Sequence, residues 1–561
     1  MKRIFLFISL ILVASVTVCA QSQDRWTILQ DGSIQWKPTR NLPHEDHVEM
    51  SGQMLSVVLR YGVDVQQRFH LNRSLVFPML RMKPNKTQNN LKQRFDVNIP
   101  AMVTVDDQTL LNEVVQDITF NGIMRVESDY GYIYRRKELK NAIHVTRILY
   151  PSINAPRYLE EYTFKNNSQN PITLRVPEWR VTYTTPEEAG VYGAYRIEAS
   201  LSKKGTFILK PGETLDFYAI YSGKKVSDDV TEKDNTAFSR ITIQSERAGR
   251  QALINQWWEN LVLDTPDPVL NRMFAFAKLR GAESIYRTKG GLMHGPGGEA
   301  YYAAVWANDQ AEYINPFFPF LGYDIGNESA LNAYRHFARY MNPEYNPIPS
   351  SIISEGVSFW HGAKDRGDGA MIAYGAARYA LARGDKEEAR ELWPLIEWCL
   401  EYCKRKLTPD GVVASNSDEL ENRFPAGDAN LCTSTLYYDA LRSAALLGRE
   451  IGVSGKQLAT YTAQAKALES AIENHFGYEI EGFHSYRYYE GNDILRSWIC
   501  MPLVMGIYTR AQGTIDALFS PRLWTNDGLL TQAGTETFWD RSTLYALRGT
   551  IAAGEVEKGM D

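Results

Sequence analysis

The sequence has few cysteines: 5 among 561 residues, one of which, Cys19, lies in an apolar N-terminal segment. None has the C-x-x-C spacing, and no histidines accompany them at the spacing of a zinc site. Disulfides are therefore excluded as the main source of stability, and we expect neither a metal nor a cofactor. The other four, Cys399, Cys403, Cys432 and Cys500, are expected to be buried small apolar residues. Cys399 and Cys403 lie about one helical turn apart, so a disulfide between these two is left open.

The sequence also lacks an excess of charge of one sign. Its 61 Lys and Arg and 66 Asp and Glu give a net charge of -5 at pH 7, so no positive field attracts nucleic acid. After the N-terminus, no apolar run is long enough to cross a bilayer. The expected partners are neutral or weakly charged molecules. The aromatic content of 12%, with 12 Trp and 32 Tyr, suits either stacking on sugar rings or a large core.

The N-terminus has the pattern of a secretory signal peptide. Two basic residues precede an apolar run over 4–18, and Val18-Cys19-Ala20 forms a small-x-small cleavage site. We therefore predict a signal peptide at 1–20 and a periplasmic or secreted protein. Cys19 also suggests a lipoprotein, but Val18 stands where a lipobox has Gly, Ala or Ser, so ordinary cleavage is favoured.

Residues 21–245 alternate in hydrophobicity with a period of two, which is typical of strands. Segments 54–61 and 142–150 show this period, and many short strands without helices between them predict a β-sandwich. Segments 158–164 and 172–176 flank an Asn-rich loop, and we interpret them as a hairpin.

Residues 246–561 change to a helical period. Short connections such as Arg383-Gly384-Asp385 alternate with long ones such as 407–427, as paired helical hairpins in a closed ring require. We therefore predict an (α/α)6-type toroid. A six-hairpin toroid needs twelve helices, whereas the sequence predicts ten, so whether this toroid lacks its last hairpin is left open. The predicted helices are 251–261, 268–284, 301–320, 328–341, 368–383, 386–406, 430–447, 455–475, 494–508 and 537–554.

Three polar clusters in this second half carry candidate functional residues. In the first, over 295–312, Trp306 and Asp309 are three residues apart and would share a helix face, so that a ring lies beside a carboxylate. This pair suits a sugar ring and its hydroxyls. A buried Trp and a capping acid at a helix start are the plain structural interpretation.

The second cluster, over 416–424, places Asp418, Glu419, Glu421 and Arg423 within six residues of the longest loop. Crowded carboxylates beside one Arg separate their pKa values, which can leave one acid protonated near neutral pH. A solvated acidic loop is the structural interpretation of the same residues.

The third cluster, over 532–542, interleaves acids, Trp539 and an Arg at a helix start. Glu536 and Asp540 are four residues apart and would share a face, or form part of a capping box. A fourth region, over 354–362, offers Trp360 and His361 as loop contacts.

A β-domain ahead of a helical toroid, with these clusters in this order, resembles the six-hairpin glycoside hydrolases, which include glucoamylases, trehalases and α-L-rhamnosidases. Trp306-Ala307-Asn308-Asp309 is similar to the W-x-R-D segment that binds sugar in the −1 subsite, with Asn308 in place of the Arg. The resemblance implies an enzyme that hydrolyses O-glycosidic bonds of an oligosaccharide or polysaccharide. We predict Trp306, Asp309, Trp360, His361, Arg423 and Trp539 as substrate contacts, of which the resemblance itself implies Trp306 and Asp309.

The resemblance also implies catalytic roles. The segment 418–421 resembles the acidic loop that supplies the general acid of glucoamylase-like enzymes, and position favours Glu421 with Glu419 as the alternate. The third cluster lies where these enzymes place the general base, which implies Glu536 or Asp540; a likeness to the T-x-W-E segment of rhamnosidases favours Asp540. An inverting pair of this kind stands about 6.5–9.5 Å apart.

Two other functions stay open. A polysaccharide lyase needs a Tyr or His base, for which Tyr301, Tyr302, His294 and His361 are available, but acidic loops fit an anionic uronate poorly. A glycan-binding protein without catalysis is the other. The sequence leaves the sugar, the linkage and the oligomeric state open.

Overall fold

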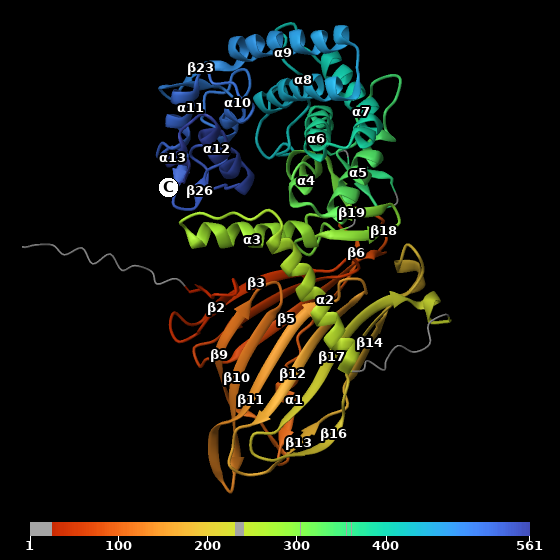
Figure 1. Ribbon diagram of the computed structural model, residues 1–561, viewed down its shortest axis with the longest axis vertical. Coiled ribbons are helices and arrows are strands. Elements are labelled where there is room, and N and C mark those ends of the chain that lie inside the picture. The colour runs from red at the N-terminus through yellow and green to blue at the C-terminus, as the bar shows by residue number, and fades with distance from the viewer. Residues whose placement is uncertain (1–24, 231–239, 303, 355, 361, 561) are drawn as a thin grey trace, which may run out of the picture.

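The computed structural model describes residues 25–230 and 240–560, except residues 303, 355 and 361. The signal peptide predicted at 1–20 lies outside the described residues. A sheet-rich N-terminal region and a helical C-terminal region lie one above the other (Figure 1). Within the described part of the chain, no helix is both long and apolar enough to span a bilayer.

The N-terminal region is a sandwich built on a large antiparallel sheet. Alternating apolar residues of this sheet point inward, and residues of the opposite parity point outward. The described strands of this sheet run, in spatial order, β1 (Thr27–Ile28), β2 (Ile34–Trp36), β9 (Leu111–Phe120), β10 (Met124–Tyr134), β11 (Lys137–Pro151), β12 (Arg157–Asn166), β17 (Thr214–Lys225), β15 (Tyr195–Leu201) and β14 (Arg180–Thr184).

Two smaller sheets complete the sandwich. Side chains of all three sheets, among them Leu59, Val126 and Leu174, form one buried core, which confirms the β-sandwich. The smaller sheets are β3 (His44–Ser51), β4 (Ser56–Val63), β5 (Phe69–Arg81) and β6 (Asn90–Phe95); and β16 (Gly205–Leu209), β13 (Ile172–Val176), β7 (Thr104–Val105) and β8 (Gln108–Thr109).

The hairpin expected from segments 158–164 and 172–176 is wrong. Both segments are strands, but β12 pairs with β11 and β17, whereas β13 pairs with β16 and β7 in another sheet. Asn166 donates from its side-chain amide to the carbonyls of Asn170 and Leu209. This asparagine therefore stabilises a crossing between two sheets rather than a tight reversal.

The C-terminal region consists of helices with short hairpins in their loops. Its helices are α2 (Arg240–Glu259), α3 (Pro268–Glu283), the π-helix η3 (Asp309–Ile314), α4 (Phe318–Leu321), α5 (Asp324–Ala338), α6 (Asp368–Arg383), α7 (Lys386–Arg405), α8 (Leu431–Ile451), α9 (Gly455–Phe476), η4 (Ser497–Cys500), α10 (Met501–Val504), α11 (Ala511–Leu518), α12 (Asp540–Ala552) and α13 (Val556–Met560). Its hairpin strands include β20 (Ala304–Trp306), β21 (Ser351–Ile353) and β22 (Ser358–Trp360).

The predicted helices agree with the structure where capping residues mark the ends of the helical hydrophobic pattern. Helix α6 ends at Gly384, whose φ of 68° is in the left-handed region, and Asp385 then accepts hydrogen bonds from two backbone N–H groups at the start of α7. The helix expected over 301–320 is wrong. That segment forms β20, the π-helix η3 and the short α4.

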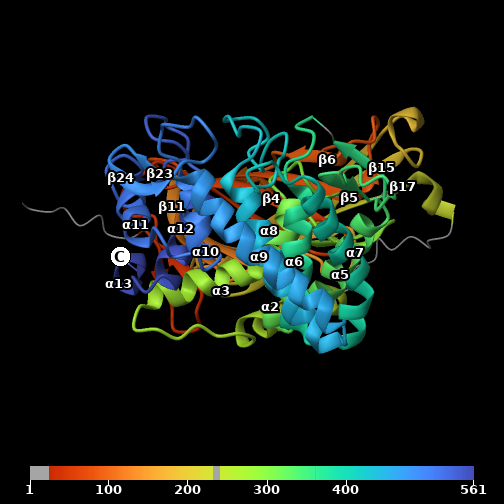
Figure 2. The ribbon, with the colours of Figure 1, turned by 90° about the horizontal axis from the view of Figure 1, so that it is seen from above.

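Helices α6, α8, α10 and α12 line the inside of a ring, in contact with one another in this order. Each of α6 and α8 is followed, after a short turn, by an outer helix, α7 and α9, that packs along it. Figure 2 shows the cyan and blue loops gathered along one edge of the helical region. Side chains of η3 and α12 close the ring, through Tyr545 and Arg541.

Helices α2 and α3 join the two regions. Figure 1 shows α2 running across the outer face of the large sheet and α3 lying between sheet and ring. Ile254 and Trp257 of α2 belong to one core with Tyr150 and Ile220 of the sheet. The domain boundary predicted at residue 245 falls within α2 and stays a prediction. The four cysteines at 399, 403, 432 and 500 are free and buried.

Glu299 forms an ionic contact between the two regions. It lies in the Gly-rich loop of the first cluster, and its carboxylate accepts from Arg60 on β4 at 2.6 Å and from Arg94 on β6 at 3.0 Å. Burial opposes ionisation of Glu299, but the hydrogen bonds from Arg60 and Arg94 outweigh it, and its pKa is lowered to about 2. Glu299 is therefore a structural residue.

We expect Glu299→Gln to lower the free energy of unfolding by about 1 kcal/mol at pH 7, since both arginines are half exposed and screened by water. The pKa of Glu299 is lowered on folding, so its contribution is present above the unfolded value of 4.5 and is lost as pH falls towards about 2. Urea unfolding at pH 7 and pH 3 should show a smaller difference at pH 3. Glu344→Gln, at an exposed acid, is the control; equal differences at both pH values would contradict this role.

Candidate active site

Glu419 lies at the centre of the candidate site. Its side chain is fully buried, and it accepts hydrogen bonds from the Nδ2 of Asn308 at 3.2 Å, the hydroxyl of Tyr313 at 3.1 Å and the Nη1 of Arg541 at 3.1 Å. These donors come from two segments of the ring far apart in sequence. A buried carboxylate with a cation and two further donors is a satisfied charge.

Arg541 connects two acids of different clusters. Besides Glu419 it binds Asp309, the first residue of η3, in a close ion pair. Its guanidinium lies 4.7 Å from the ring centre of Tyr313 and 5.7 Å from that of Trp539. Asp309 is 15% exposed, so this acid borders the open side of the cluster.

Arg366, just before α6, makes a second connection. Its guanidinium is fully buried and binds Asp368 at 2.8 Å, Glu421 at 3.1 Å and the Oδ1 of Asn308 at 3.3 Å. Asn308 thus donates to Glu419 and accepts from Arg366. The side chain that replaces the Arg of the W-x-R-D segment therefore joins the two ionic groups.

Glu421 differs from Glu419 in exposure and in backbone conformation. Its side chain is 25% exposed, and Arg423 lies 3.8 Å away as a second cation. Glu421 and Asn422 have φ values of 58° and 63°. Two successive non-glycine residues in the left-handed region are strained, and such strain is concentrated at functional sites.

The aromatic residues border the same cluster. Trp306 on β20 pairs with Ser351 on β21, which pairs with Trp360 on β22. Directly opposed residues of antiparallel strands point to the same face, so both indoles lie on one side of this small sheet. The expectation that Trp306 shares a helix face with Asp309 is wrong, because Trp306 lies in a strand.

Two cations link the remaining indoles to the acids. The Arg366 guanidinium lies 5.7 Å from the ring centre of Trp360, and that of Arg423 lies 5.4 Å from Trp539. The sequence-predicted contacts Trp306, Asp309, Trp360, Arg423 and Trp539 are therefore connected with Glu419 and Glu421 in one cluster.

Glu312 lies on the π-helix behind this cluster. It is buried, and its Oε2 accepts from Tyr545 of α12 at 3.0 Å. Burial, with the nearby charge of Glu419 as the second cause, raises the pKa of Glu312 well above its ordinary value. Burial and a neighbouring negative charge both disfavour the ionised form of Glu312, whereas Glu419 has a cation beside it in Arg541.

Two further buried acids support the loops. Asp418 accepts from the hydroxyl of Tyr488 at 2.7 Å and from the backbone of Leu420, and burial raises its pKa. Asp365 accepts from Tyr402 and from the backbone of Gly367, and its pKa is also raised by burial. These residues position the segments that carry Glu419 and Arg366.

Three predicted site residues lie outside these contacts. Glu536 and Asp540 are exposed on either side of Trp539, and neither forms a hydrogen bond or ion pair among the described residues. Asp540 is the first residue of α12, where the helix dipole favours a carboxylate. His361 lies outside the described residues.

The sequence interpretation placed Arg541 in the third cluster and Glu312 in the first but gave neither a site role, and it did not single out Arg366. Arg366 binds Asp368 two residues later, whereas its other acid, Glu421, and the acids of Arg541, Glu419 and Asp309, lie 55 to 232 residues away. One local signal existed: Asn308, Asp309 and Glu312 all lie within six residues of Trp306. A π-helix, which is uncommon and frequent at functional sites, brings Glu312 and Tyr313 into the ring.

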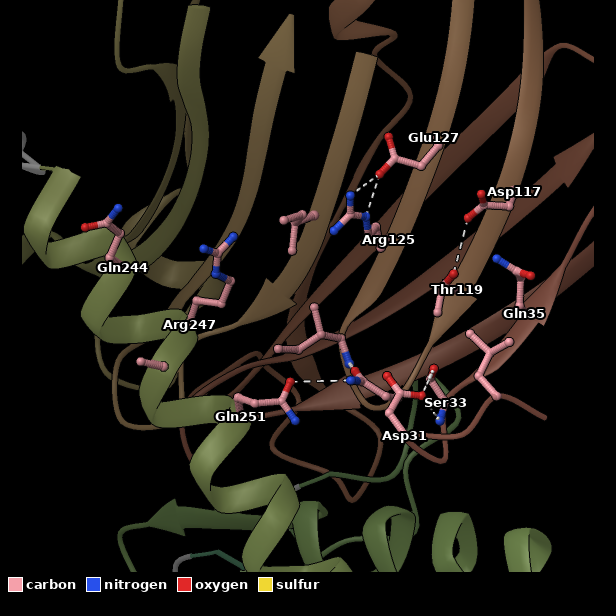
Figure 3. Close-up of a pocket in the computed structure, with 15 residues that line it drawn as sticks. Asp31, Ser33, Gln35, Asp117, Thr119, Arg125, Glu127, Gln244, Arg247 and Gln251 are labelled. Atoms are coloured by element: carbon pink, nitrogen blue, oxygen red, sulfur yellow. Dashed lines mark hydrogen bonds and ion pairs between the residues drawn. The ribbon is translucent and has the colours of Figure 1, made fainter. Parts of the chain in front are cut away.

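A second groove lies far from these acids, between α2 and the outer face of the large sheet (Figure 3). It has a volume of about 770 Å³. Arg125 is paired with Glu127 and Arg247 with Glu161, while Asp31 and Asp117 accept from the hydroxyls of Ser33 and Thr119. Polar side chains on the solvent face of an antiparallel sheet are ordinary.

Comparison with solved structures identifies the architecture. No family model and no curated protein matches the chain. A protein described as a kojibiose phosphorylase from the human microbiome is similar over 95% of this chain and 84% of its own, with a TM-score of 0.55 at 9% identity. A bacterial glucoamylase, solved in complex with acarbose, is similar over 92% and 88%, with a TM-score of 0.50 at 10% identity.

The chain therefore has the fold of these proteins: an antiparallel sheet-rich region followed by an (α/α)6-type toroid. This confirms the predicted fold class and the fold part of the resemblance. Structural similarity at sequence identities near 10% identifies the fold but not the roles of individual residues, so the roles of the site residues stay predictions.

We expect Arg541→Gln to destabilise the protein by about 3 kcal/mol, because it leaves Glu419 charged, buried and without its cation. Glu419→Gln in the same chain should recover part of this loss, since the unpaired charge is then absent. Urea unfolding of the wild type, both single variants and the double variant measures the coupling. Additive losses in the double variant would contradict the ion pair.

Proposed function

We propose that this protein is a secreted glycoside hydrolase that cleaves O-glycosidic bonds of an oligosaccharide or polysaccharide by an inverting mechanism. One observation carries the proposal: acids of two ring segments, Asp309 and the pair Glu419 and Glu421, meet through two arginines at the loop end of the ring. This end is bordered by three indoles. The fold shared with a glucoamylase and a phosphorylase supports it.

We assign Glu421 as the general acid, with Glu419 as the alternate. Its partial exposure allows contact with a bound sugar, whereas Glu419 is covered. The strained backbone at Glu421 fixes the direction of its carboxyl group, and Arg366 holds it from behind. In the reaction a proton passes from Glu421 to the glycosidic oxygen while the bond to the anomeric carbon breaks.

The general base is assigned to Asp540, with Glu536 as the alternate. Both are exposed carboxylates without partners among the described residues, and both flank Trp539, which borders Arg423 and Arg541. The base removes a proton from water as that water attacks the opposite face of the anomeric carbon. The product then has the inverted anomeric configuration.

The indoles and ionic groups bind the sugar in this proposal. Trp306, Trp360 and Trp539 offer flat faces for sugar rings. Asp309 and Arg423, both partly exposed, offer an acceptor and a donor for hydroxyl groups, and His361 stays a predicted contact. Together with the signal-peptide pattern at 1–20, these groups support a periplasmic or secreted enzyme that acts on a glycan.

Lyase chemistry is less well supported because its candidate bases have structural roles. Tyr302 is buried and accepts from the backbone of Glu299 at 2.6 Å, and Tyr301 accepts from Gln88 at 2.7 Å. Burial lowers the pKa of His294 to about 3. Tyr302, which is enclosed, lacks access to a uronate.

The first experiment is a screen of monosaccharides released from plant and host glycans. New reducing ends support hydrolysis. Unsaturated products that absorb in the ultraviolet would show a lyase, and sugar phosphates formed only with added inorganic phosphate would show a phosphorylase. Glycan binding without release of sugar at high enzyme loading would identify a non-catalytic binding protein. Each of these three results, lyase, phosphorylase or binding protein, would contradict the proposal.

We expect Glu421→Gln to lower the rate of release by about 10²–10⁴-fold without unfolding the protein, because the leaving oxygen loses its proton donor. The loss should be much smaller on an aryl glycoside whose leaving group needs no proton. Asp540→Asn should lose activity on both substrates. An equal loss on both for Glu421→Gln would identify Glu421 as the base, in keeping with its ion pairs to Arg366 and Arg423, and would transfer the acid to Glu419.

A further inference from the structure

A second cavity of the ring has a volume of about 780 Å³. It is lined by residues at the end of α6 and just after η3 and α10; Arg378 lies in the second half of α6, Arg442 in the middle of α8, and Arg548 in the third turn of α12. The candidate active site is at the starts of η3, α6 and α12. The cavity therefore lies towards the other ends of η3 and α6.

The charges of this cavity do not balance. Arg378 is paired with Asp439 at 2.7 Å, and Ser443 also donates to this aspartate. Arg442 donates only to the carbonyl of Met505, and Arg548 only to the hydroxyl of Tyr374. Among the described residues neither of these two arginines has a carboxylate partner. The cavity therefore has two positive charges in excess.

Glu312 lies on the inner wall of the cavity, where its Oε2 accepts from Tyr545. Burial raises the pKa of Glu312, so this acid adds little negative charge to offset the two arginines.

Aromatic groups form much of the remaining wall. Tyr313 and Tyr374 lie inside, and Phe320 and Tyr508, which are 62% and 46% exposed, lie at the rim. Exposed rings at the edge of a cavity suit a ligand with a flat or ring-shaped body. The volume of about 780 Å³ is also far larger than a free phosphate ion needs.

We propose that this cavity binds a phosphate monoester of a small ring-containing molecule, with Arg442 and Arg548 holding the phosphate and the tyrosines facing the ring. Two guanidinium groups match the double negative charge and the several acceptor oxygens of a phosphate monoester. Arg378 is held by Asp439 and forms part of the wall. The site goes beyond the proposed hydrolysis, since it contains none of the acids assigned to catalysis.

Calorimetry at constant ionic strength tests this site on the full-length protein. The probes are glucose 6-phosphate and inorganic phosphate, with glucose as the uncharged control. Glucose 6-phosphate should bind with one site per chain and more tightly than inorganic phosphate, and glucose should not bind in this cavity. Constant ionic strength is needed because salt screens the arginines.

The variants are Arg442→Gln and Arg548→Gln, singly and together. Each should weaken binding about tenfold, because each removes charge-assisted hydrogen bonds to the phosphate. Arg449→Gln is the matched control: it lies on the same helix, removes the same charge and does not line the cavity. Both cavity arginines are exposed, and circular dichroism with a melting temperature confirms folding of each variant.

Three results would overturn the site: no saturable binding of either phosphate probe, equal weakening by Arg449→Gln, or binding that survives the double variant. In the last case Arg423→Gln shows whether the anion binds at the loop end instead. Loss of glycan hydrolysis plays no part in this test, so failure of the proposed function and failure of the phosphate site are separate results.

Discussion

The buried charge of Glu419 is the constraint on which the candidate site depends. A carboxylate removed from water is tolerated only when nearby groups replace the hydrogen bonds it loses. Here Asn308 and Tyr313 come from the first inner segment of the ring and Arg541 from α12. Since these segments are more than 200 residues apart, Glu419 is satisfied only when the ring has closed. Folding of the toroid and assembly of the site are therefore one event.

The same constraint makes the two ends of the ring different. Glu419 faces its cation Arg541, whereas its neighbour Glu312, whose ionised form burial disfavours, accepts from Tyr545. On the loop side the acids outnumber their arginines and meet indoles. On the other side Arg442 and Arg548 have no carboxylate partner in the part of the chain that the structure describes. One closely spaced pair of acids thus separates an end suited to neutral sugars from an end suited to an anion.

The fold was predictable where its signals are local. The Gly384-Asp385 turn gave the boundaries of α6 and α7, because an αL glycine and a capping aspartate act within a few residues. The connection from β12 to β13 was not predictable. An Asn-rich turn suits a hairpin within one sheet and a crossing to another sheet equally, and only the pairing with distant strands distinguishes them. Segment 301–320 failed for a related reason: Trp306 pairs with Ser351, 45 residues later, and this pairing outweighs the helical period. Likewise, acids and indoles could be picked out by composition, but the acids that connect the clusters, Glu421 for Arg366 and Glu419 and Asp309 for Arg541, are distant in the sequence.

The strain at Glu421 and Asn422 has a physical basis in these distant partners. Two consecutive residues at positive φ cost of order 1–3 kcal/mol each, and a free loop would relax. This loop is fixed just before the strained residues, Asp418 by Tyr488 and Glu419 by Arg541, while Arg366 holds Glu421 itself. The buried acids therefore keep an exposed one in a conformation it would not adopt alone. Glu421 can be directed at a bound sugar because Glu419, which the sugar does not need to touch, holds the loop in place.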